Sequence, residues 1–163
     1  GTLPVAGSPP VADDTPLALV AGHLFFSGYD GDYSNNYDFP YELWQVEITM
    51  PVGTPGASAR VKDINSGLGS SPHQFAVVGN LLFFTANDGI NGNELWRSDG
   101  TDTGTFRLSN SDMGGMQSPQ ILSRDQSRLL FSGSYSTVWI TDGTQSGTVE
   151  LTSLEPYSAR LYV

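Results

Sequence analysis

The chain lacks cysteine, has a single lysine (Lys62), and contains no apolar run long enough to cross a bilayer. Without cysteine there are no disulfide bonds, thiolate metal ligands or cysteine nucleophiles. Because no apolar run approaches about 18 residues, we expect no membrane-spanning helix. Charged residues make up only 15% of the 163 residues, against roughly 25% in typical soluble domains. Serine, threonine, asparagine, glycine and proline therefore supply most of the polarity.

Basic residues are scarce, with 7 against 17 acidic residues and a formal net charge of −10. An acidic surface repels phosphate backbones and anionic lipids, so we expect neither nucleic-acid binding nor membrane association. The same balance suits a soluble extracellular protein or one that binds cations. The sequence starts at Gly1-Thr2 with neither an initiator methionine nor a signal peptide, which predicts a processed or excised chain.

What the sequence does contain favours an all-β fold. Nineteen glycines and ten prolines predict many turns. Aromatic residues reach 11% and apolar residues 38%, enough for a packed core. Helical periodicity is absent, and short apolar segments alternate with turn residues throughout.

A repeated order of features decides the architecture. Each of three copies opens with Ser-Pro, at Ser8-Pro9, Ser71-Pro72 and Ser118-Pro119. First strands are predicted at Leu17–Val20, Phe75–Val78 and 121–122, and second strands at Leu24–Ser27, Leu82–Thr85 and Leu129–Ser132. Third strands carry Trp44, Trp96 and Trp139. A turn with Gly-Thr then leads into a fourth strand in each copy, at Gly53, Gly100 and Gly143.

The spacing of the copies is typical of propeller blades. Leu82 follows Leu24 by 58 residues, and Leu129 follows Leu82 by 47. Units of four short strands and about 40–50 residues are characteristic of β-propellers. Asp-Gly between apolar strands predicts a tight hairpin turn in which Gly100 and Gly143 take a positive φ. We expect the recurring tryptophans to pack between blades.

These residues resemble the ELWxxDGT repeat family of large exported bacterial proteins. The matching segments are Leu82–Gly89, Gly92–Trp96, Ser98–Thr101, Gly104-Thr105 and Arg60–Ile64. The first copy is interrupted, and the third lacks both the Asp-Gly-x-x-Gly loop and the glutamate. The resemblance implies a propeller-like β fold and a secreted or cell-surface location in a bacterium. It implies no single activity and supplies no catalytic residues.

We therefore interpret residues 1–163 as one propeller segment. Residues 1–7 would be the outer strand of a preceding blade, and 154–163 the first strand of a further blade. The three full blades would comprise residues 8–67, 68–115 and 116–153. Natural propellers have about 4–8 blades, so three do not close a ring. Either the chain belongs to a larger propeller, or two chains associate into a ring of six blades.

The loop between the second strand and the tryptophan strand is longest in the first copy. It extends over 18 positions from Phe26 to Trp44, against 12 in the second copy and 8 in the third. Within it, four oxygen-bearing side chains fall at positions 1, 3, 5 and 9: Asp30, Asp32, Ser34 and Asp38. This spacing resembles short calcium loops, whose alternate side chains converge on one ion. The alternative is an acidic, solvated hairpin loop without a metal.

The same loop is rich in aromatic rings: Tyr29, Tyr33, Tyr37, Phe39 and Tyr41. Tyrosine combines a flat apolar face with a hydroxyl, which suits sugar rings and protein partners. The alternative is that the rings pack the loop onto the blade. In the second copy, Asp88–Glu94 is interpreted as a turn shaped by its glycines, in which Glu94 or Asn93 bonds the backbone.

No catalytic constellation is evident. Glu42 and Glu94 occupy equivalent repeat positions, which does not support an acid–nucleophile pair. His23 and His73 lie at different repeat positions and lack partners at metal-ligand spacing. The sequence thus favours an extracellular binding or scaffold module that recognises a glycan or a protein through loop 28–41, with Ca²⁺ as the candidate cofactor. The alternative function is a polysaccharide hydrolase or lyase on a propeller scaffold.

Overall fold

The computed structural model describes residues 16–29, 40–48, 56–66, 68–109, 119–133 and 137–153. These residues form three four-stranded antiparallel sheets and no helix. The expectation of an all-β chain built from three four-stranded units is therefore confirmed. The terminal strands predicted at residues 1–7 and 154–163 lie outside the described residues.

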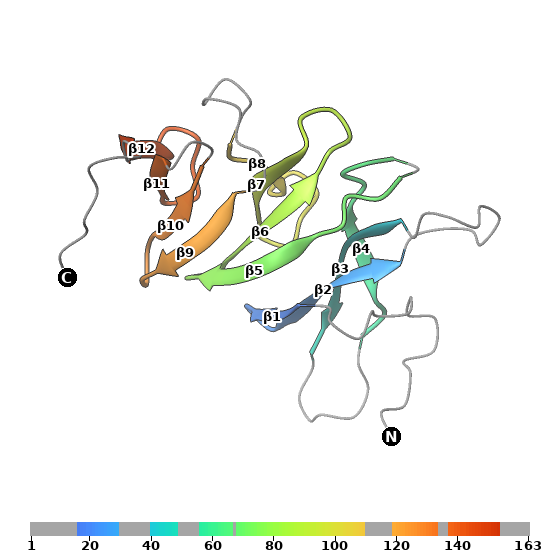
Figure 1. The fold of residues 1–163 in the computed structure, drawn as a ribbon. Coiled ribbons are helices and arrows are strands. Elements are labelled where there is room, and N and C mark those ends of the chain that lie inside the picture. The colour runs from blue at the N-terminus through green and yellow to red at the C-terminus, as the bar shows by residue number, and fades with distance from the viewer. Residues whose placement is uncertain are drawn as a thin grey trace.

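Each sheet is a simple meander in which every strand pairs with its neighbours in sequence (Figure 1). The first sheet comprises β1 (Leu17–Val20), β2 (His23–Tyr29), β3 (Tyr41–Glu47) and β4 (Ala59–Lys62). The second comprises β5 (His73–Val78), β6 (Leu81–Asn87), β7 (Asn93–Ser98) and β8 (Phe106–Arg107). The third comprises β9 (Gln120–Arg124), β10 (Leu129–Ser132), β11 (Thr137–Thr141) and β12 (Val149–Ser153).

The strand register repeats the sequence pattern. Phe26 pairs with Trp44 in the first sheet, and the same aromatic pair recurs in the other two as Phe84–Trp96 and Phe131–Trp139. In the latter two pairs the rings are stacked, with centroids 6.5 and 6.4 Å apart. Opposed aromatic side chains of this kind stabilise antiparallel pairs.

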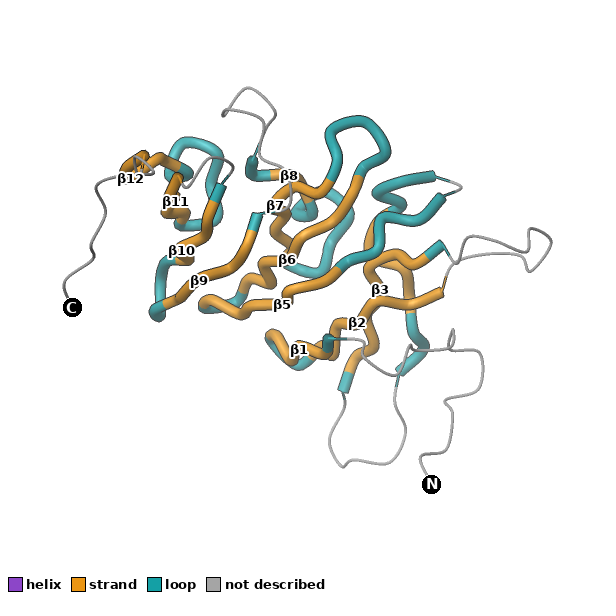
Figure 2. The backbone as a smooth tube through the Cα atoms, viewed as in Figure 1, coloured by secondary structure: helices purple, strands orange, loops and turns teal. Residues whose placement is uncertain are grey.

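The three sheets lie side by side, and β5 contacts both β1 and β9 (Figure 2). One apolar cluster joins the first and second sheets, with Phe25 and Leu43 on one side and Phe84 and Trp96 on the other. A second cluster joins the second and third sheets, with Phe83 packed near Trp139. Because successive side chains of a strand point to opposite faces, β6 contributes to both clusters.

The tryptophans at the two internal junctions are core residues, as predicted. Trp96 and Trp139 are each only 7% exposed. Trp44, at the same position in the first sheet, is half-buried. Across the described residues, no helix is long and apolar enough to cross a membrane.

Candidate functional site

The predicted binding loop leaves the first sheet at Tyr29 and returns at Tyr41. These residues pair directly at the open ends of β2 and β3. Their rings meet edge to face, with centroids 6.2 Å apart and planes at 74°. The remaining predicted ligands lie outside the described residues: Asp30, Asp32, Tyr33, Ser34, Tyr37, Asp38 and Phe39. The structure thus describes the base of this loop but none of the proposed calcium ligands.

The base of the loop is held by the connection from β4 to β5. The backbone amides of Ser70 and Ser71 both donate to the Tyr41 carbonyl, at 2.8 and 3.0 Å. Gly69 has φ of +74°, and a Cβ there would lie 2.4 Å from Pro40 Cα, so only glycine fits. The loop therefore starts from a closely packed platform on the first sheet.

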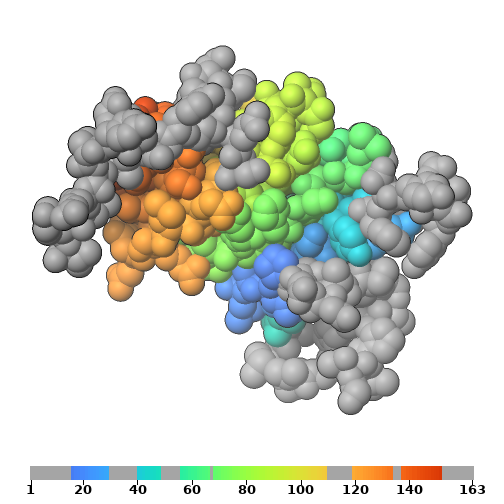
Figure 3. Space-filling model, viewed as in Figure 1, coloured from blue at the N-terminus to red at the C-terminus, as the bar shows by residue number. Residues whose placement is uncertain are grey.

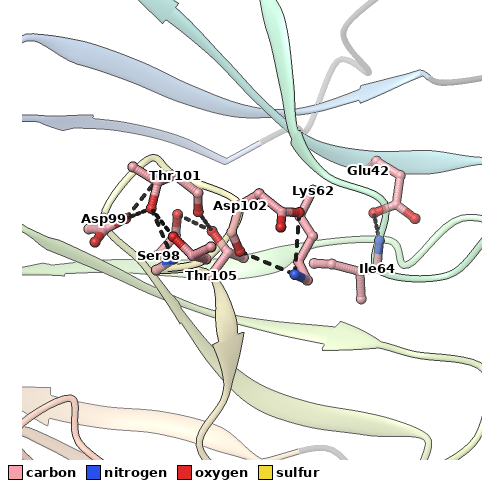
Figure 4. A network of polar contacts seen from close by, with 10 residues as sticks. Glu42, Lys62, Ile64, Ser98, Asp99, Thr101, Asp102 and Thr105 are labelled. Atoms are coloured by element: carbon pink, nitrogen blue, oxygen red, sulfur yellow. Dashed lines mark hydrogen bonds and ion pairs between the residues drawn. The ribbon is translucent and has the colours of Figure 1, made fainter.

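Glu42, next to this platform, is buried with 1% of its side chain exposed. Its Oε1 accepts from the Asn65 amide at 3.0 Å, and its Oε2 accepts from the Ser70 hydroxyl at 2.7 Å. Oε2 also accepts from the Ile64 amide at 3.2 Å (Figure 4). Burial raises the pKa of Glu42, although these hydrogen bonds partly offset the effect. The carboxylate fastens the β4–β5 connection and is fully engaged in doing so.

Glu94 holds the equivalent position in the second sheet and is completely buried. The Ser109 hydroxyl donates to its Oε2, while Ser109 Oγ accepts from the Leu95 amide at 2.8 Å. No donor contacts its Oε1 among the described residues. Burial raises the pKa of Glu94 as well. Each glutamate thus bonds the chain that follows its own sheet, which gives the two carboxylates no common site for glycoside hydrolysis.

The loop between β6 and β7 is organised by Asp88. Its Oδ1 accepts from the amides of Ile90 and Asn91 at 3.0 and 2.7 Å, and its Oδ2 pairs with Arg107 at 3.3 Å. Burial alone would raise the pKa of Asp88, but the bonds from Asn91 and Ile90, with the Arg107 charge, hold it below its usual value. The two loop glycines, Gly89 and Gly92, have positive φ.

This arrangement adds a third side chain to the sequence interpretation, which named Glu94 or Asn93 as the group that bonds the backbone. The carboxylate shown to bond the loop backbone is Asp88, whereas the carboxylate of Glu94 bonds the Ser109 side chain. The signal was present in the sequence as Asp followed by Gly, because aspartate commonly bonds the amides two and three residues ahead.

The repeated Asp-Gly-Thr turn is a closed hydrogen-bonded unit (Figure 4). Asp99 Oδ1 accepts from the amide and hydroxyl of Thr101, at 2.9 and 2.7 Å, and Thr101 Oγ1 accepts from the Gly104 amide. Thr105 Oγ1 then donates to the Thr101 carbonyl at 2.6 Å. The third sheet repeats each of these bonds with equivalent residues: Asp142, Thr144, Gly147 and Thr148.

In both turns the central glycine has a positive φ, +94° at Gly100 and +91° at Gly143, as the sequence predicts. The hydrogen bonds lower the pKa of Asp99 and of Asp142, with the threonine hydroxyl as the largest cause in each. The aspartate and threonine side chains of the repeat are therefore hydrogen-bonded within the turn.

Each turn also accepts a hydrogen bond from the preceding sheet. Gln45 Nε2 in β3 donates to the Gly100 carbonyl at 2.7 Å, and Arg97 Nη1 in β7 donates to the Gly143 carbonyl at 3.0 Å. Both donors directly follow the repeat tryptophan. Lys62 adds a contact at the first junction, where its Nζ lies 3.3 Å from Asp102 Oδ1 (Figure 4). Sequence reasoning missed these junction bonds.

Metal-ligating side chains do not gather elsewhere in the described part of the chain. No group of three or more histidine, cysteine, aspartate or glutamate side chains could hold an ion there. His23 begins β2 and His73 begins β5, so the histidines lie in different sheets. His73 Nδ1 lies 2.9 Å from the Ser71 carbonyl, which accounts for one of its ring nitrogens.

Comparison with known proteins finds no matching family model, no matching curated protein and no matching solved structure. The resemblance to the ELWxxDGT repeat family therefore rests on the repeat residues themselves.

Proposed function

We propose that the chain is a propeller-type binding or scaffold module of an exported protein, and that its partner surface is loop 28–41. The propeller arrangement is supported by the side-by-side sheets, in which β5 contacts both β1 and β9, and by the equivalent hydrogen bond at both junctions. Radial repetition of this kind gives each four-stranded unit a neighbour for its apolar faces.

The observation that carries the binding role is that the acidic residues of the repeat accept hydrogen bonds inside the fold. Glu42, Glu94, Asp99 and Asp142 all accept internal hydrogen bonds. The polar groups that define the repeat are therefore committed to structure. What distinguishes the first copy is its long loop, which starts from the Tyr29–Tyr41 pair. Loops mounted on a rigid sheet are the usual location of binding residues.

The proposed class of partner, a glycan or a protein, is based on the aromatic side chains of loop 28–41. Tyrosine and phenylalanine side chains provide flat apolar surfaces for the faces of sugar rings, and tyrosine hydroxyls add hydrogen bonds. The same residue types dominate the contact energy of protein interfaces. A neutral glycan or a protein surface fits both this composition and the net charge of −10.

The binding proposal is tested on a printed array of neutral and acidic oligosaccharides and against panels of extracellular matrix proteins. We expect a restricted set of signals that is lost in the double variant Tyr33→Ala/Tyr37→Ala. The matched control is Ile90→Ala, in the β6–β7 loop, where the side chain is 88% exposed. A wild-type chain that binds none of these probes, or binding that survives the tyrosine variant, would contradict the proposal.

Calcium is a separate part of the proposal, assigned to Asp30, Asp32, Ser34 and Asp38. A ligand that binds only the folded state raises the unfolding midpoint by mass action. We expect the thermal midpoint to rise with added Ca²⁺ and to return to its initial value with EDTA. Asp30→Asn/Asp32→Asn should remove the response. An identical midpoint with Ca²⁺ and with EDTA would exclude the calcium loop and leave the binding role of the rings in place.

A further inference from the structure

The two end sheets each have an apolar face that matches a buried junction face elsewhere in the chain. We define the leading face as Leu17, Leu19, Leu24 and Trp44 of the first sheet, around Phe26, which is only 5% exposed, and the trailing face as Leu130, Val138, Ile140, Val149 and Leu151 of the third. Leu17 and Leu19 are 60% and 62% exposed, and Val149 and Leu151 are 46% and 53% exposed. Figure 3 shows the described atoms of the first and third sheets on opposite sides of the second sheet.

The trailing face has apolar residues at the same positions as the faces that the first and second sheets pack against the sheet after them. Leu130 corresponds to Phe83 of the second sheet, Val138 to Leu95, and Leu151 to Leu108, and these counterparts are 0%, 0% and 3% exposed. The first sheet has buried apolar residues at the same positions: Phe25, Leu43 and Val61. The third sheet thus keeps a junction face although no described sheet covers it.

The leading face has the same residue pattern as the faces that the second and third sheets pack against the sheet before them. Trp44 and Phe26 correspond to Trp96 and Phe84, which pack against the first sheet, and to Trp139 and Phe131, which pack against the second. Leu19 corresponds to Val77, which packs partly buried against the first junction cluster. The leading face thus supplies the side chains that a trailing face receives, and one chain carries one of each.

We propose that a second copy of this chain docks its leading face on the trailing face, and that two such contacts close a ring of six sheets. The contact would continue the two junctions already present within the chain. A head-to-tail contact closes when its rotation divides a full turn, and two copies then use all four end faces. Six sheets fall within the range of natural propellers, about 4–8.

One position shows that this contact is more apolar than the internal junctions. The residue after the repeat tryptophan is Gln45 in the first sheet and Arg97 in the second, and both donate to the next sheet. In the third sheet it is Ile140, whose side chain has no hydrogen-bond donor. Each copy also carries a net charge of −10, so the two copies repel. Because salt screens that repulsion and apolar burial is largely insensitive to it, we expect association to strengthen with salt.

The test is the mass of the purified chain in sedimentation velocity, from micromolar to sub-millimolar concentration and at low and high salt. We expect a concentration-dependent species of twice 17.5 kDa. Leu19→Asp on the leading face and Leu151→Asp on the trailing face should each raise the dissociation constant by about tenfold or more, because a charge replaces a buried leucine. Ile90→Asp, on an 88% exposed side chain away from both faces, should not.

A mixing experiment identifies the geometry. An equimolar mixture of Leu19→Asp and Leu151→Asp chains retains one intact contact between unlike variants, so it should recover part of the dimer that each variant loses alone. A wild-type chain that stays monomeric throughout would overturn the proposal. So would a dimer that survives either single variant, because leading-to-leading or trailing-to-trailing pairing would then explain it.

This proposal rests on the propeller-type arrangement but not on the binding loop. The Tyr33→Ala/Tyr37→Ala variant should keep the wild-type mass at every concentration, whether or not it binds an oligosaccharide. Loss of dimer with retained binding, or the reverse, therefore tells the two proposals apart.

Discussion

Strands β6 and β10 have the same place in their repeats and nearly the same sequence, yet they differ in burial. In β6, five consecutive residues from Leu82 to Ala86 are buried, whereas in β10 burial alternates from one residue to the next. The alternation in β10 reflects a single covered face, and the continuous burial in β6 reflects a sheet on either side. Between these two strands, the difference in burial follows the neighbouring sheets, because the local sequence is shared.

The turns show the opposite behaviour. The Asp-Gly-Thr turns of the second and third sheets form the same hydrogen bonds, and the Asp99–Thr101 and Asp142–Thr144 hydroxyl bonds are both 2.7 Å. These bonds lie within eight residues of sequence and do not depend on what packs nearby. The repeat thus combines local features that are identical in each copy with packing that depends on position in the row.

The largest expected difference is between Phe83→Ala and Leu130→Ala. Phe83 is completely buried between two sheets, so its truncation should cost about 3–5 kcal/mol of unfolding free energy. Leu130 is half-buried, and its truncation should cost about 1 kcal/mol. Urea unfolding in a Leu151→Asp background, which suppresses association, measures both.

A matched pair controls this comparison. Leu82 and Leu129 occupy equivalent positions on the covered faces and are both 0% exposed. Their replacement by alanine should cost similar amounts, about 2–5 kcal/mol each. If Leu130→Ala proved as damaging as Phe83→Ala in the monomer, the third sheet would have a cover that the described residues do not show.

The second prediction concerns the turns, where the two sheets should respond alike. A Cβ added at Gly104 would lie 2.0 Å from Asp99 Oδ1, and one at Gly147 would lie 2.1 Å from Asp142 Oδ1. Each alanine must displace its aspartate and the bonds it accepts, at a cost of about 1–3 kcal/mol. Thermal unfolding of Gly104→Ala and Gly147→Ala should show comparable losses.

Gly56 provides the control for these turn variants. It directly precedes Ala57, the first-copy counterpart of Gly104 and Gly147 by strand register, and an added Cβ would lie 3.3 Å from Glu47 Cβ, a contact that a small shift relieves. Gly56→Ala should therefore cost less than either turn variant. A large difference between Gly104→Ala and Gly147→Ala would show that the turns depend on packing after all.

The third prediction compares how much the hydrogen bonds at the two junctions contribute to stability. Gln45→Met and Arg97→Met each remove a donor to the next sheet while preserving most of the side-chain volume. Each should cost about 0.5–1.5 kcal/mol. Arg97→Met should cost more, because its guanidinium also lies 4.5 Å from the centre of the Phe106 ring. Lys62→Met, which removes a more exposed ion pair, should cost less than about 1 kcal/mol. Chemical denaturation orders the three variants.

The smallest expected effect is on pH dependence. Burial raises the pKa of Glu94 above its ordinary 4.5, so stability from this group is complete below pH 4.5 and is lost as pH rises through the folded-state pKa. Glu94→Gln cannot titrate, and its unfolding free energy should fall less than that of the wild type over this range. Denaturation at a series of pH values measures the slope.

Asp88, at the end of the same sheet, should change the pH dependence of stability in the opposite direction. Its pKa is held below the ordinary 3.8, so its contribution is present above that pH and is lost as pH falls. Asp88→Asn should therefore reduce the acid sensitivity of the chain. If Glu94→Gln and Asp88→Asn changed the pH profile in the same direction, the assignment of one of the two shifts would be wrong.

Sequence periodicity was sufficient to predict the strands and turns, because these depend on residues close together in the chain. The strand Leu129–Ser132 agrees with the prediction residue for residue, and β6 and β2 extend the predicted core by a few residues at their ends. The glycine conformations at Gly100 and Gly143 followed from their place after aspartate. The recurrence of tryptophan at one repeat position also predicted a core tryptophan at the internal junctions.

What sequence reasoning could not supply are the contacts between residues far apart in the chain. The bond from Gln45 to the Gly100 carbonyl spans 55 residues, and its acceptor is a backbone atom that carries no side-chain signal. The engagement of Glu42 by the connection after β4 is similar, since two of its three donors are backbone amides. At the predicted ligand site, the structure describes only the base formed by Tyr29 and Tyr41. The calcium and binding roles of loop 28–41 stay predictions.

The junction hydrogen bonds have a consequence for how such chains change over time. The donor is a side chain, but the acceptor is the main-chain oxygen of a glycine, so the receiving unit needs only to form the turn. If a four-stranded unit were duplicated or moved, its donor side chain could bond the glycine carbonyl in the turn of any following unit. For this hydrogen bond, compatibility between neighbours depends on one side chain per unit, and the apolar clusters supply the rest of the junction, so whole units can be duplicated or exchanged where both features are kept.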